Sequence, residues 1–508
     1  MSLIGAIIKG AIHLKDGLTP SVDHIKAQKA VLDHLLDTAK DTAFGKNYDF
    51  EAIAQSEDSQ LAFSKNIPYF DYNKLKEEWW DKVINGEENI TWPGSPDYFA
   101  LSSGTTGKTS KRIPVTEAMV SAIRQAGIKQ VEALSNFDLP ISFFDKDIMM
   151  LGSSTDLEER DGHLEGEISG ITASRIPFWF ESYYKPGKEI AKIDDWDERV
   201  QKIAEEATQF DIGALSGIPS WMELMIKKVI DYHKVDNIHQ IWPNLQVYTS
   251  GGVAFSPYEK SFNALLEKPI TVIDTYLASE GFIASQQRPE TDAMQLITDG
   301  GIYFEFVPFD AEYINQDGSI KQEAPSITLD KVELDQDYVL LISTVSGAWR
   351  YVIGDTIEFT DVERAEIRIT GRTKFFLNVV GSQLSVNKMN TALRALEKQY
   401  DIQIPEFTLA AVRIDGEFNH HWYLGTESKE DESNLAEALD NLLQEANKNY
   451  RVARTKALKG VKVTTVDPIL FTEWSGAQKK KGGQVKMERV MSEEKFEAWK
   501  SFVEDASK

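Results

Sequence analysis

The chain has 508 residues, of which 42% are hydrophobic, 10% aromatic and 27% charged, a composition ordinary for a folded globular protein. Lys and Arg total 55 against 80 Asp and Glu, and the net charge of −25 argues against nucleic acid and anionic lipid as partners. The absence of cysteine excludes disulfides, thiolate metal sites and a cysteine nucleophile, and it fits a cytoplasmic location.

The apolar run at residues 3–8 is too short to span a membrane, and no basic residue precedes it as in a signal peptide. Ile4, Ile7, Ile8 and Ile12 fall at helical spacing. They predict an amphipathic helix packed on the body of the protein, with attachment to a membrane surface as the alternative.

Further along the chain, hydrophobic periodicity predicts helices over residues 22–44, 72–84 and 116–134. Strand-like and helix-like segments then alternate from 147 to 276, and strands dominate from about 300 to 370. After Gly371 and Arg372 the pattern becomes a compact mixture of helices and strands. We therefore predict a large multi-layer α/β domain with a β-rich subdomain over residues 1–371, and a small α+β domain over residues 372–508.

The strongest local feature is the sequence Leu-Ser-Ser-Gly-Thr-Thr-Gly-Lys-Thr-Ser-Lys at residues 101–111. Its glycines allow backbone amides to converge on an anion, its hydroxyls donate hydrogen bonds, and its lysines neutralise charge, so it predicts a phosphate-binding loop. A P-loop is excluded because its first glycine would fall at Ser102, and because Pro114 interrupts the helix that must follow. We predict a loop within a hairpin; a polar turn without a ligand is the alternative.

Two acidic residues follow strand-like segments. Glu280 follows a β-branched strand that ends near Tyr276, and a carboxylate there is suited to hold Mg²⁺ on ATP phosphates. Asp355 ends the sequence Trp-Arg-Tyr-Val-Ile-Gly-Asp at 349–355, where its carboxylate is suited to accept both hydroxyls of a ribose. The alternatives are a solvated loop glutamate and an ordinary Gly-Asp turn.

In this order, the three elements resemble the nucleotide-binding motifs of the Gretchen Hagen family of acyl acid–amido synthetases, part of the superfamily of adenylate-forming enzymes. The resemblance covers nearly the whole chain. It extends to Gly-Ile-Pro-Ser-Trp at 217–221, Tyr-Thr-Ser-Gly-Gly at 248–252, Gly371-Arg372 and Gly-Gly-Gln-Val-Lys at 482–486. Two departures from plant members, Val352 and Glu488, caution against assuming a plant hormone as the substrate.

The resemblance implies a role for each matching residue. The triphosphate would be lined by Ser102, Ser103, Thr105 and Thr106, with Gly104 and Gly107 shaping the loop and Lys108 neutralising charge. Ser279 and Glu280 would lie near the α-phosphate and Mg²⁺, Tyr276 would stack on adenine, Gly251 and Gly252 would form the adenine-side loop, and Asp355 would hold the ribose. Arg372 would bind nucleotide where the two domains meet, and Lys486 would reach the α-phosphate when the small domain closes as a lid.

These roles predict an ATP- and Mg²⁺-dependent ligase that converts a small carboxylic acid into its acyl-adenylate. The acyl group then passes to an amine, expected to be an amino acid, giving an amide, AMP and pyrophosphate. No protein nucleophile is needed, and the chain has no Gly-x-Ser-x-Gly, His-Glu-x-x-His or Gly-x-Gly-x-x-Gly motif. The alternatives are an acyl-coenzyme A ligase, which shares the first half-reaction, and a nucleotide-binding protein without turnover.

Overall fold

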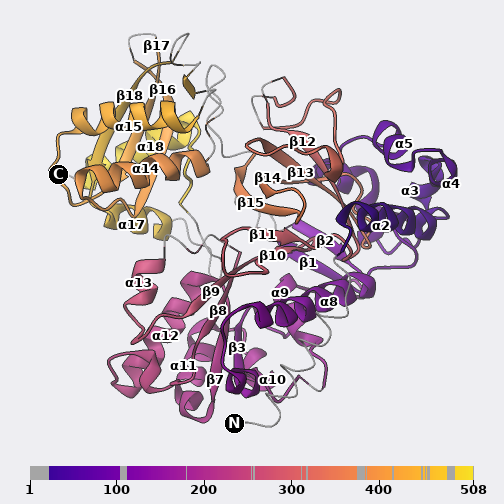
Figure 1. Ribbon diagram of the computed structural model, residues 1–508, viewed down its shortest axis with the longest axis horizontal. Coiled ribbons are helices and arrows are strands. Elements are labelled where there is room, and N and C mark those ends of the chain that lie inside the picture. The colour runs from indigo at the N-terminus through magenta and orange to yellow at the C-terminus, as the bar shows by residue number, and fades with distance from the viewer. Residues whose placement is uncertain are drawn as a thin grey trace.

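The computed structural model describes residues 22–102, 111–178, 180–252, 255, 258–310, 312–315, 318–373, 384, 386–414, 417–447, 450–451, 454, 458–477 and 487–506. Its elements form three sheets with helices packed around them (Figure 1). No helix in this part of the chain has the length and apolar character needed to cross a membrane. The helix predicted over residues 4–12 lies outside the described residues.

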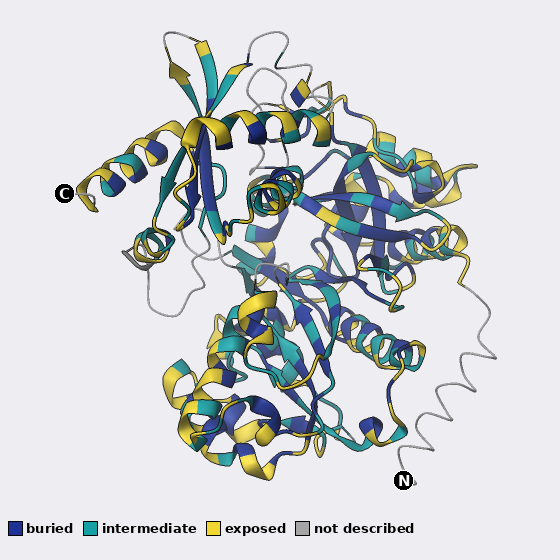
Figure 2. Ribbon diagram, turned by 60° about the vertical axis from the view of Figure 1, so that its left-hand side comes forward, coloured by how far each residue is buried: buried dark blue, intermediate teal, exposed yellow. Residues whose placement is uncertain are grey.

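An eleven-stranded sheet runs through the centre of the molecule, and Figure 2 shows most of its strands buried. From one edge to the other it contains β12 (Ile302–Pro308), β13 (Asp337–Thr344), β14 (Tyr351–Asp361), β15 (Glu366–Arg372), β11 (Met294–Leu296), β10 (Gly281–Ser285), β9 (Thr271–Ala278), β8 (Val247–Gly251), β7 (Ile212–Gly217), β3 (Asp147–Leu151) and β6 (Tyr184–Lys185). The strands from β9 to β6 pair in parallel, and those from β12 to β9 pair antiparallel.

Helices cover the parallel part of this sheet because its strands are apolar on both faces. On one face α11 (Trp196–Glu206), α12 (Pro219–His233) and α13 (Glu259–Asn263) bury their apolar sides against β3, β7 and β8 (Figure 1). Asp195 caps α11 by accepting a hydrogen bond of 2.8 Å from the backbone N–H of Glu198. Pro219 occupies the first turn of α12, where its missing N–H costs nothing. The other face is covered by η2 (Leu134–Asn136) and η3 (Ile141–Asp145).

The N-terminal helices pack against the antiparallel part of the large sheet. They are α2 (His24–Ala39), α3 (Ala43–Asn47), α4 (Phe50–Gln55), α5 (Ser59–Asn66), α6 (Tyr72–Leu75), the π-helical turn η1 (Lys76–Trp80) and α7 (Asp81–Ile84). The rings of Phe44, Phe50 and Phe63 surround Trp349, which lies just ahead of β14. These contacts join the first eighty residues of the described chain to strands that follow much later.

Arg350 fixes the same junction. Its guanidinium is buried, pairs with buried Glu305 at 3.0 Å, and donates hydrogen bonds to the carbonyl oxygens of Ser64 and Ile67 at the end of α5. Its backbone lies in the left-handed region at φ +40°, which is costly for a residue with a long side chain. The buried hydrogen bonds hold it there, one residue before Tyr351 enters the candidate site.

A second sheet presents the hydroxyl-rich loop. Its strands are β2 (Lys111–Val115), β1 (Tyr98–Ser102), β5 (His163–Gly166) and β4 (Glu158–Arg160), in that order, with α8 (Glu117–Ala133) and α9 (Ile168–Ser174) nearby. β1 and β2 are antiparallel, with Ser102 opposite Lys111, so the predicted hairpin is confirmed. The strands β4 and β5 were not predicted, because β4 is fully exposed and carries no apolar alternation.

The C-terminal part is an α+β unit, as predicted. Strands β16 (Glu406–Ile414), β17 (Glu417–Gly425) and β18 (Leu458–Val466) form a sheet with α14 (Val386–Tyr400) and α15 (Glu432–Ala446) on one face and α17 (Ile469–Ala477) and α18 (Glu493–Ala506) on the other. The α/β fold class with its β-rich part is thus confirmed, whereas the boundary at residues 371 and 372 stays a prediction.

Two adjacent histidines of β17 point to opposite faces of this small sheet, as their alternation predicts. His420 lies 5.6 Å from the Tyr450 ring, and His421 lies 5.3 Å from the Phe496 ring on the other side. Burial lowers the pKa of His420 to about 3 and that of His421 to about 4. Both are therefore neutral parts of the core rather than acid–base groups.

Candidate active site

The hairpin of β1 and β2 places one end of the hydroxyl-rich segment beside the N-terminal helices. Ser102 ends β1 and Lys111 begins β2, while Ser103–Gly107 and Lys108 lie outside the described residues. The ammonium of Lys111 sits 5.1 Å from the centre of the Tyr72 ring, and the Tyr72 hydroxyl accepts a hydrogen bond of 2.9 Å from the backbone N–H of Arg112. Tyr72 thus fixes where the second strand of the hairpin begins.

Ser279 and Glu280 form the tight turn between β9 and β10. Glu280 was predicted at the carboxyl end of a parallel strand, and β9 does pair in parallel with β8. After Glu280 the chain turns back as β10, which pairs antiparallel with β9. The Glu280 carboxylate accepts a hydrogen bond from the Tyr351 hydroxyl. Burial raises the pKa of Glu280 and the charge of Asp355 raises it further, while Lys111 acts in the opposite direction.

Asp355 is held from two sides. The Tyr276 hydroxyl donates a hydrogen bond to one carboxylate oxygen, and the Nε of Arg372 lies 2.6 Å from the other. Asp355 and Arg372 face each other across β14 and β15, which explains why these residues meet. Burial and the charge of Asp355 raise the pKa of Tyr276, so its hydroxyl stays protonated and donates. The predicted stacking of Tyr276 on adenine stays a prediction.

Gly251 and Gly252 lie at the end of β8, next to β9. A side chain at Gly251 would bring its Cβ to 2.8 Å from Thr275 Oγ1, which no real Cβ tolerates. Gly252 has φ +78°, a conformation that favours glycine, and its added Cβ would meet Ile218 at 3.3 Å. Both positions therefore favour glycine, because Thr275 and Ile218 fill the space that a side chain would need.

The structure brings four of the described predicted residues into one electrostatic cluster. Tyr276, Glu280, Asp355 and Arg372 lie close enough for their charges to shift one another's pKa values. They come from β9, the β9–β10 turn, β14 and β15. Lys486, like Lys108 and Ser103–Gly107, lies outside the described residues.

Three further residues are not among the predicted site residues: Tyr351 and Lys111, which both act on Glu280, and Asp274 on β9. Asp274 lies on β9 two residues before Tyr276, and so on the same face of the strand. Burial and the charge of Asp292 raise the pKa of Asp274 to about 6. Tyr351 and Lys111 lie within recognised segments. No sequence signal marked Asp274, because its raised pKa comes from burial and from the charge of Asp292 in the folded protein.

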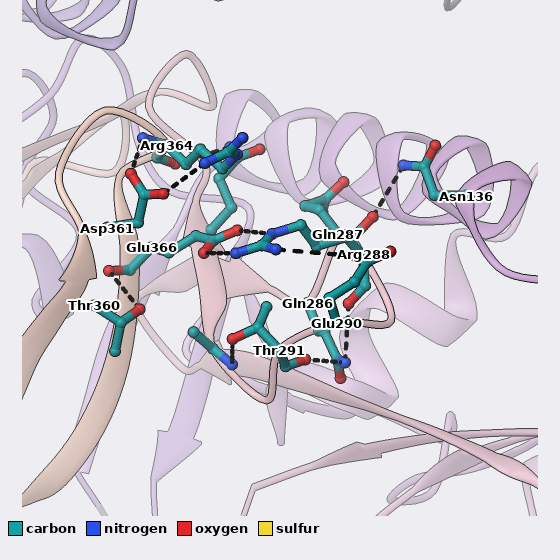
Figure 3. A network of polar contacts seen from close by, with 12 residues as sticks. Asn136, Gln286, Gln287, Arg288, Glu290, Thr291, Thr360, Asp361, Arg364 and Glu366 are labelled. Carbon is teal, nitrogen blue, oxygen red and sulfur yellow. Dashed lines mark hydrogen bonds and ion pairs between the residues drawn. The ribbon is translucent and has the colours of Figure 1, made fainter.

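The loop beside Asp274 is fixed by a polar network (Figure 3). Gln286 accepts a hydrogen bond from the backbone N–H of Asp274 and donates to the carbonyl oxygens of Arg288 and Thr291. Arg288 makes two hydrogen bonds of 2.7 Å to the buried carboxylate of Glu366 on β15 (Figure 3). The network therefore ties the strand that carries Tyr276 to the strand that ends at Arg372.

The donor set of this cluster can be compared with what a divalent cation requires. Within the described ranges, no group of three or more His, Cys, Asp or Glu side chains is arranged to enclose a metal. Glu280 offers one half-buried carboxylate. This fits Mg²⁺, which typically takes one or two carboxylates and fills its remaining positions with water and phosphate oxygens.

Family models match three stretches of the chain: the GH3 family N-terminal domain at residues 21–201, the central domain at 295–372 and the C-terminal domain at 386–495. A probable indole-3-acetic acid-amido synthetase, GH3.9 of Oryza sativa subsp. japonica, is 27% identical over 38% of this chain and 44% of its own length. The jasmonoyl–L-amino acid synthetase GH3.5 of the same organism is 21% identical over 82% of this chain and 83% of its own length. The chain thus spans less than half the length of the first of these curated relatives.

Solved structures support the same fold. The acyl acid amido synthetase AtGH3.15, in complex with 2,4-DB, is 18% identical and superposes with a TM-score of 0.73 over 97% of this chain and 96% of its own. A 2-hydroxyisobutyryl-CoA ligase is 14% identical, with a TM-score of 0.56 over 96% of this chain and 93% of its own. The family models, in the order in which they follow one another along the sequence, show that the chain belongs to the GH3 family.

Proposed function

We propose that the protein is an ATP- and Mg²⁺-dependent acyl acid–amido synthetase. In the first half-reaction a carboxylate oxygen of the acid bonds to the α-phosphorus of ATP, and pyrophosphate leaves. In the second, an amine nitrogen bonds to the acyl carbon, AMP leaves with the electron pair, and the nitrogen loses a proton. The curated relatives named above are amido synthetases, which favours an amino acid as the amine.

One observation carries this proposal. Asp355, held between Tyr276 and Arg372, lies close enough to Glu280 to raise its pKa, and Glu280 in turn faces Lys111 at the base of the hydroxyl-rich hairpin. An acceptor for the ribose (Asp355), a carboxylate suited to a metal ion (Glu280) and a cation for phosphate (Lys111) thus come together from segments far apart in the sequence. ATP presents these three chemistries, ribose, metal-bound phosphate and anionic phosphate, in one molecule.

The residues would act chiefly by electrostatics, because the transfer of an adenylyl group gathers negative charge. Lys111 neutralises charge on the phosphates, and Tyr72 holds its ammonium in place. Asp355 would accept hydrogen bonds from the ribose with the lone pairs that Tyr276 and Arg372 leave unused. Mg²⁺ bound at Glu280 would supply further charge stabilisation at the phosphate oxygens. The raised pKa of Glu280 means that a cation and a proton compete for the same carboxylate.

The proposal also includes the predicted residues that lie outside the described ranges. Ser103–Gly107 and Lys108 would complete the phosphate loop whose two ends are the paired strands β1 and β2. Lys486 would come from the C-terminal part, residues 372–508, acting as a lid. A closed lid would keep water from the adenylate, which hydrolyses readily. A cytoplasmic location fits an enzyme that draws on cellular ATP.

Acyl transfer to coenzyme A is the second candidate function, since a coenzyme A ligase shares the fold at a TM-score of 0.56. The experiment that separates the candidates measures pyrophosphate release with a panel of aryl, indolyl and aliphatic acids, with amino acids or coenzyme A added. Amide formation with amino acids supports the proposal. Thioester formation alone supports the second candidate, and a protein that binds ATP but releases no pyrophosphate with any acid contradicts both.

A further inference from the structure

Arg199 lies in the first turn of α11, at the carboxyl edge of the parallel part of the large sheet. The helix lies in the connection between the parallel strands β6 and β7, and the segment just ahead of it bonds to the chain that follows the end of β3. Its beginning therefore lies where the parallel strands end. In open α/β sheets this edge is where ligands bind. Arg199 is only 5% exposed, although arginine is rarely buried unless it is paired.

Within the described part of the chain, the guanidinium of Arg199 has no carboxylate within ion-pairing distance. Its buried Nε has no hydrogen-bond acceptor among those residues. The neighbouring carboxylates of Asp194 and Glu167 act on it only from a distance, and Glu167 instead accepts a hydrogen bond from Ser153. A buried cation without an anion is costly, and a bound anion would remove that cost.

The side chains around Arg199 form a suitable environment for such an anion. Arg199 lies over the Trp196 ring at 5.5 Å, and Trp196 packs on Trp221 at 5.2 Å. Tyr184 is buried, and its hydroxyl is near enough to Arg199 for the two groups to interact electrostatically. Burial raises the pKa of Tyr184 to about 12, so at neutral pH this hydroxyl is a donor. A guanidinium with an unpartnered Nε and a phenol hydroxyl therefore lie near each other, beside two aromatic rings.

A chain of contacts joins this position to the candidate active site. Trp221 belongs to the first turn of α12, which begins directly after Ile218. Ile218 is the residue that a side chain at Gly252 would contact. The predicted adenine-side loop and the Arg199 position therefore share one edge of the sheet, separated by the start of α12.

We propose that Arg199 and Tyr184 bind a carboxylate that does not itself react. This rests on the proposed function, in which the acid that is activated loses its charge on becoming an adenylate. A carboxylate that keeps its charge is then either that of the acceptor amino acid or a second carboxylate on the acyl acid. A guanidinium and a phenol hydroxyl donate to such a group, and the aromatic rings exclude water from it.

The test compares Arg199→Met with the wild type, using Lys202→Met as a matched control because Lys202 is an exposed lysine of the same helix. Arg199→Met should leave thermal stability unchanged or raised, since it removes an unpaired buried charge. It should raise the KM of the carboxylate-bearing substrate about tenfold to hundredfold, the range for losing a charge-assisted hydrogen bond. Arg199→Lys should recover part of this loss, and Lys202→Met should change neither quantity.

Two arms identify the source of the carboxylate. Amino acids are compared with their amides as acceptors, and dicarboxylic acids with monocarboxylic acids as acyl donors in pyrophosphate release. A selective increase in KM for amino acids, or for dicarboxylic acids, supports the proposal and names the source. Equal KM values of Arg199→Met and the wild type for amino acids, their amides, dicarboxylic acids and monocarboxylic acids overturn the proposal. A loss of thermal stability in Arg199→Met without a change in KM also overturns it.

Failure of the proposed function is recognised separately, as a wild type that releases no pyrophosphate with any acid. Calorimetric titration of the wild type and Arg199→Met with free amino acids and dicarboxylates, without ATP, then decides whether Arg199 binds a carboxylate. Binding by the wild type that the variant loses supports the inference even in that case. Identical titrations of the two proteins overturn it.

Discussion

Asp274 offers a quantitative test of the electrostatics of the candidate site. Its pKa is raised from 3.8 to about 6 by burial and by the charge of Asp292, so the folded protein holds its proton more tightly than the unfolded chain does. Each pKa unit corresponds to about 1.4 kcal/mol, so the ionised carboxylate lowers the free energy of unfolding at pH 7 by about 3 kcal/mol. Asp274→Asn removes the charge and keeps the shape, and should stabilise the ligand-free protein by about that amount.

The stability difference between Asp274→Asn and the wild type should depend on pH. Below pH 3.8 both states of the wild type carry the proton, and the variant should have no advantage. The advantage of the variant should grow as the pH rises from about 4 to about 6, because the unfolded wild type has lost its proton there while the folded wild type still holds it. Above about pH 6 both states have lost the proton, and the advantage should stay constant.

Urea unfolding between pH 3.5 and pH 8 measures this difference, and hydrogen exchange of the peptides that cover β8 and β9 assigns it to the correct region. Asp37→Asn is the control, since Lys40 lowers the pKa of that exposed carboxyl and the same substitution should act in the opposite direction. Equal stability of Asp274→Asn and wild type at pH 7, or an advantage that persists at pH 3.5, would refute the reasoning.

Four further outcomes are expected. Asp355→Asn should weaken ATP binding in calorimetric titration by on the order of 1.5–3 kcal/mol, because charge-assisted hydrogen bonds are lost; an unchanged Kd would count against the ribose role. Glu280→Gln should reduce pyrophosphate release far more than ATP affinity, and unaltered release at saturating Mg²⁺ would make this glutamate a turn residue only. His420→Leu should resist acid better than the wild type, whose neutral histidine (pKa about 3) loses stability as the pH falls below about 6.5; superimposable pH-unfolding curves would contradict this. Lys486→Ala should slow adenylation by ~10²–10³-fold while a presynthesised acyl-adenylate still transfers its acyl group, and an equal loss in both half-reactions would exclude a specific role.

The sequence predicted those features of the site that depend on local chemistry. Glycines, hydroxyls and lysines in one short segment predicted the hairpin between β1 and β2. The Gly-Asp pair at 354–355 was expected to end a strand but lies within β14, and the ribose role of Asp355 stays a prediction. Strand alternation likewise predicts opposite faces for the neighbours His420 and His421, as the structure shows. In each of these cases the informative residues are neighbours in the chain.

Features that depend on the assembled protein were not predictable in this way. Asp274 and Arg199 are ordinary residues in the sequence, and only burial without sufficient pairing makes them unusual. Lys108, predicted for the phosphates, lies outside the described residues. Among the described lysines, Lys111 acts on Glu280, and Tyr72 from a helix far earlier in the chain lies against it. Pairing partners separated by hundreds of residues leave no local pattern.

The buried guanidinium of Arg350 also bears on how the chain is synthesised. It bonds to carbonyl oxygens 283 and 286 positions earlier, so the helices that carry Ser64 and Ile67 leave the ribosome long before their partner exists. At about 5–20 residues per second, the delay is roughly 15–60 s. During that time the rings of Phe44, Phe50 and Phe63 lack the indole of Trp349 and offer an apolar surface to chaperones. Stalled nascent chains that end before residue 300 should therefore bind a hydrophobic dye that chains extended past β15 exclude, and equal dye binding by both would show that the helices bury this surface on their own.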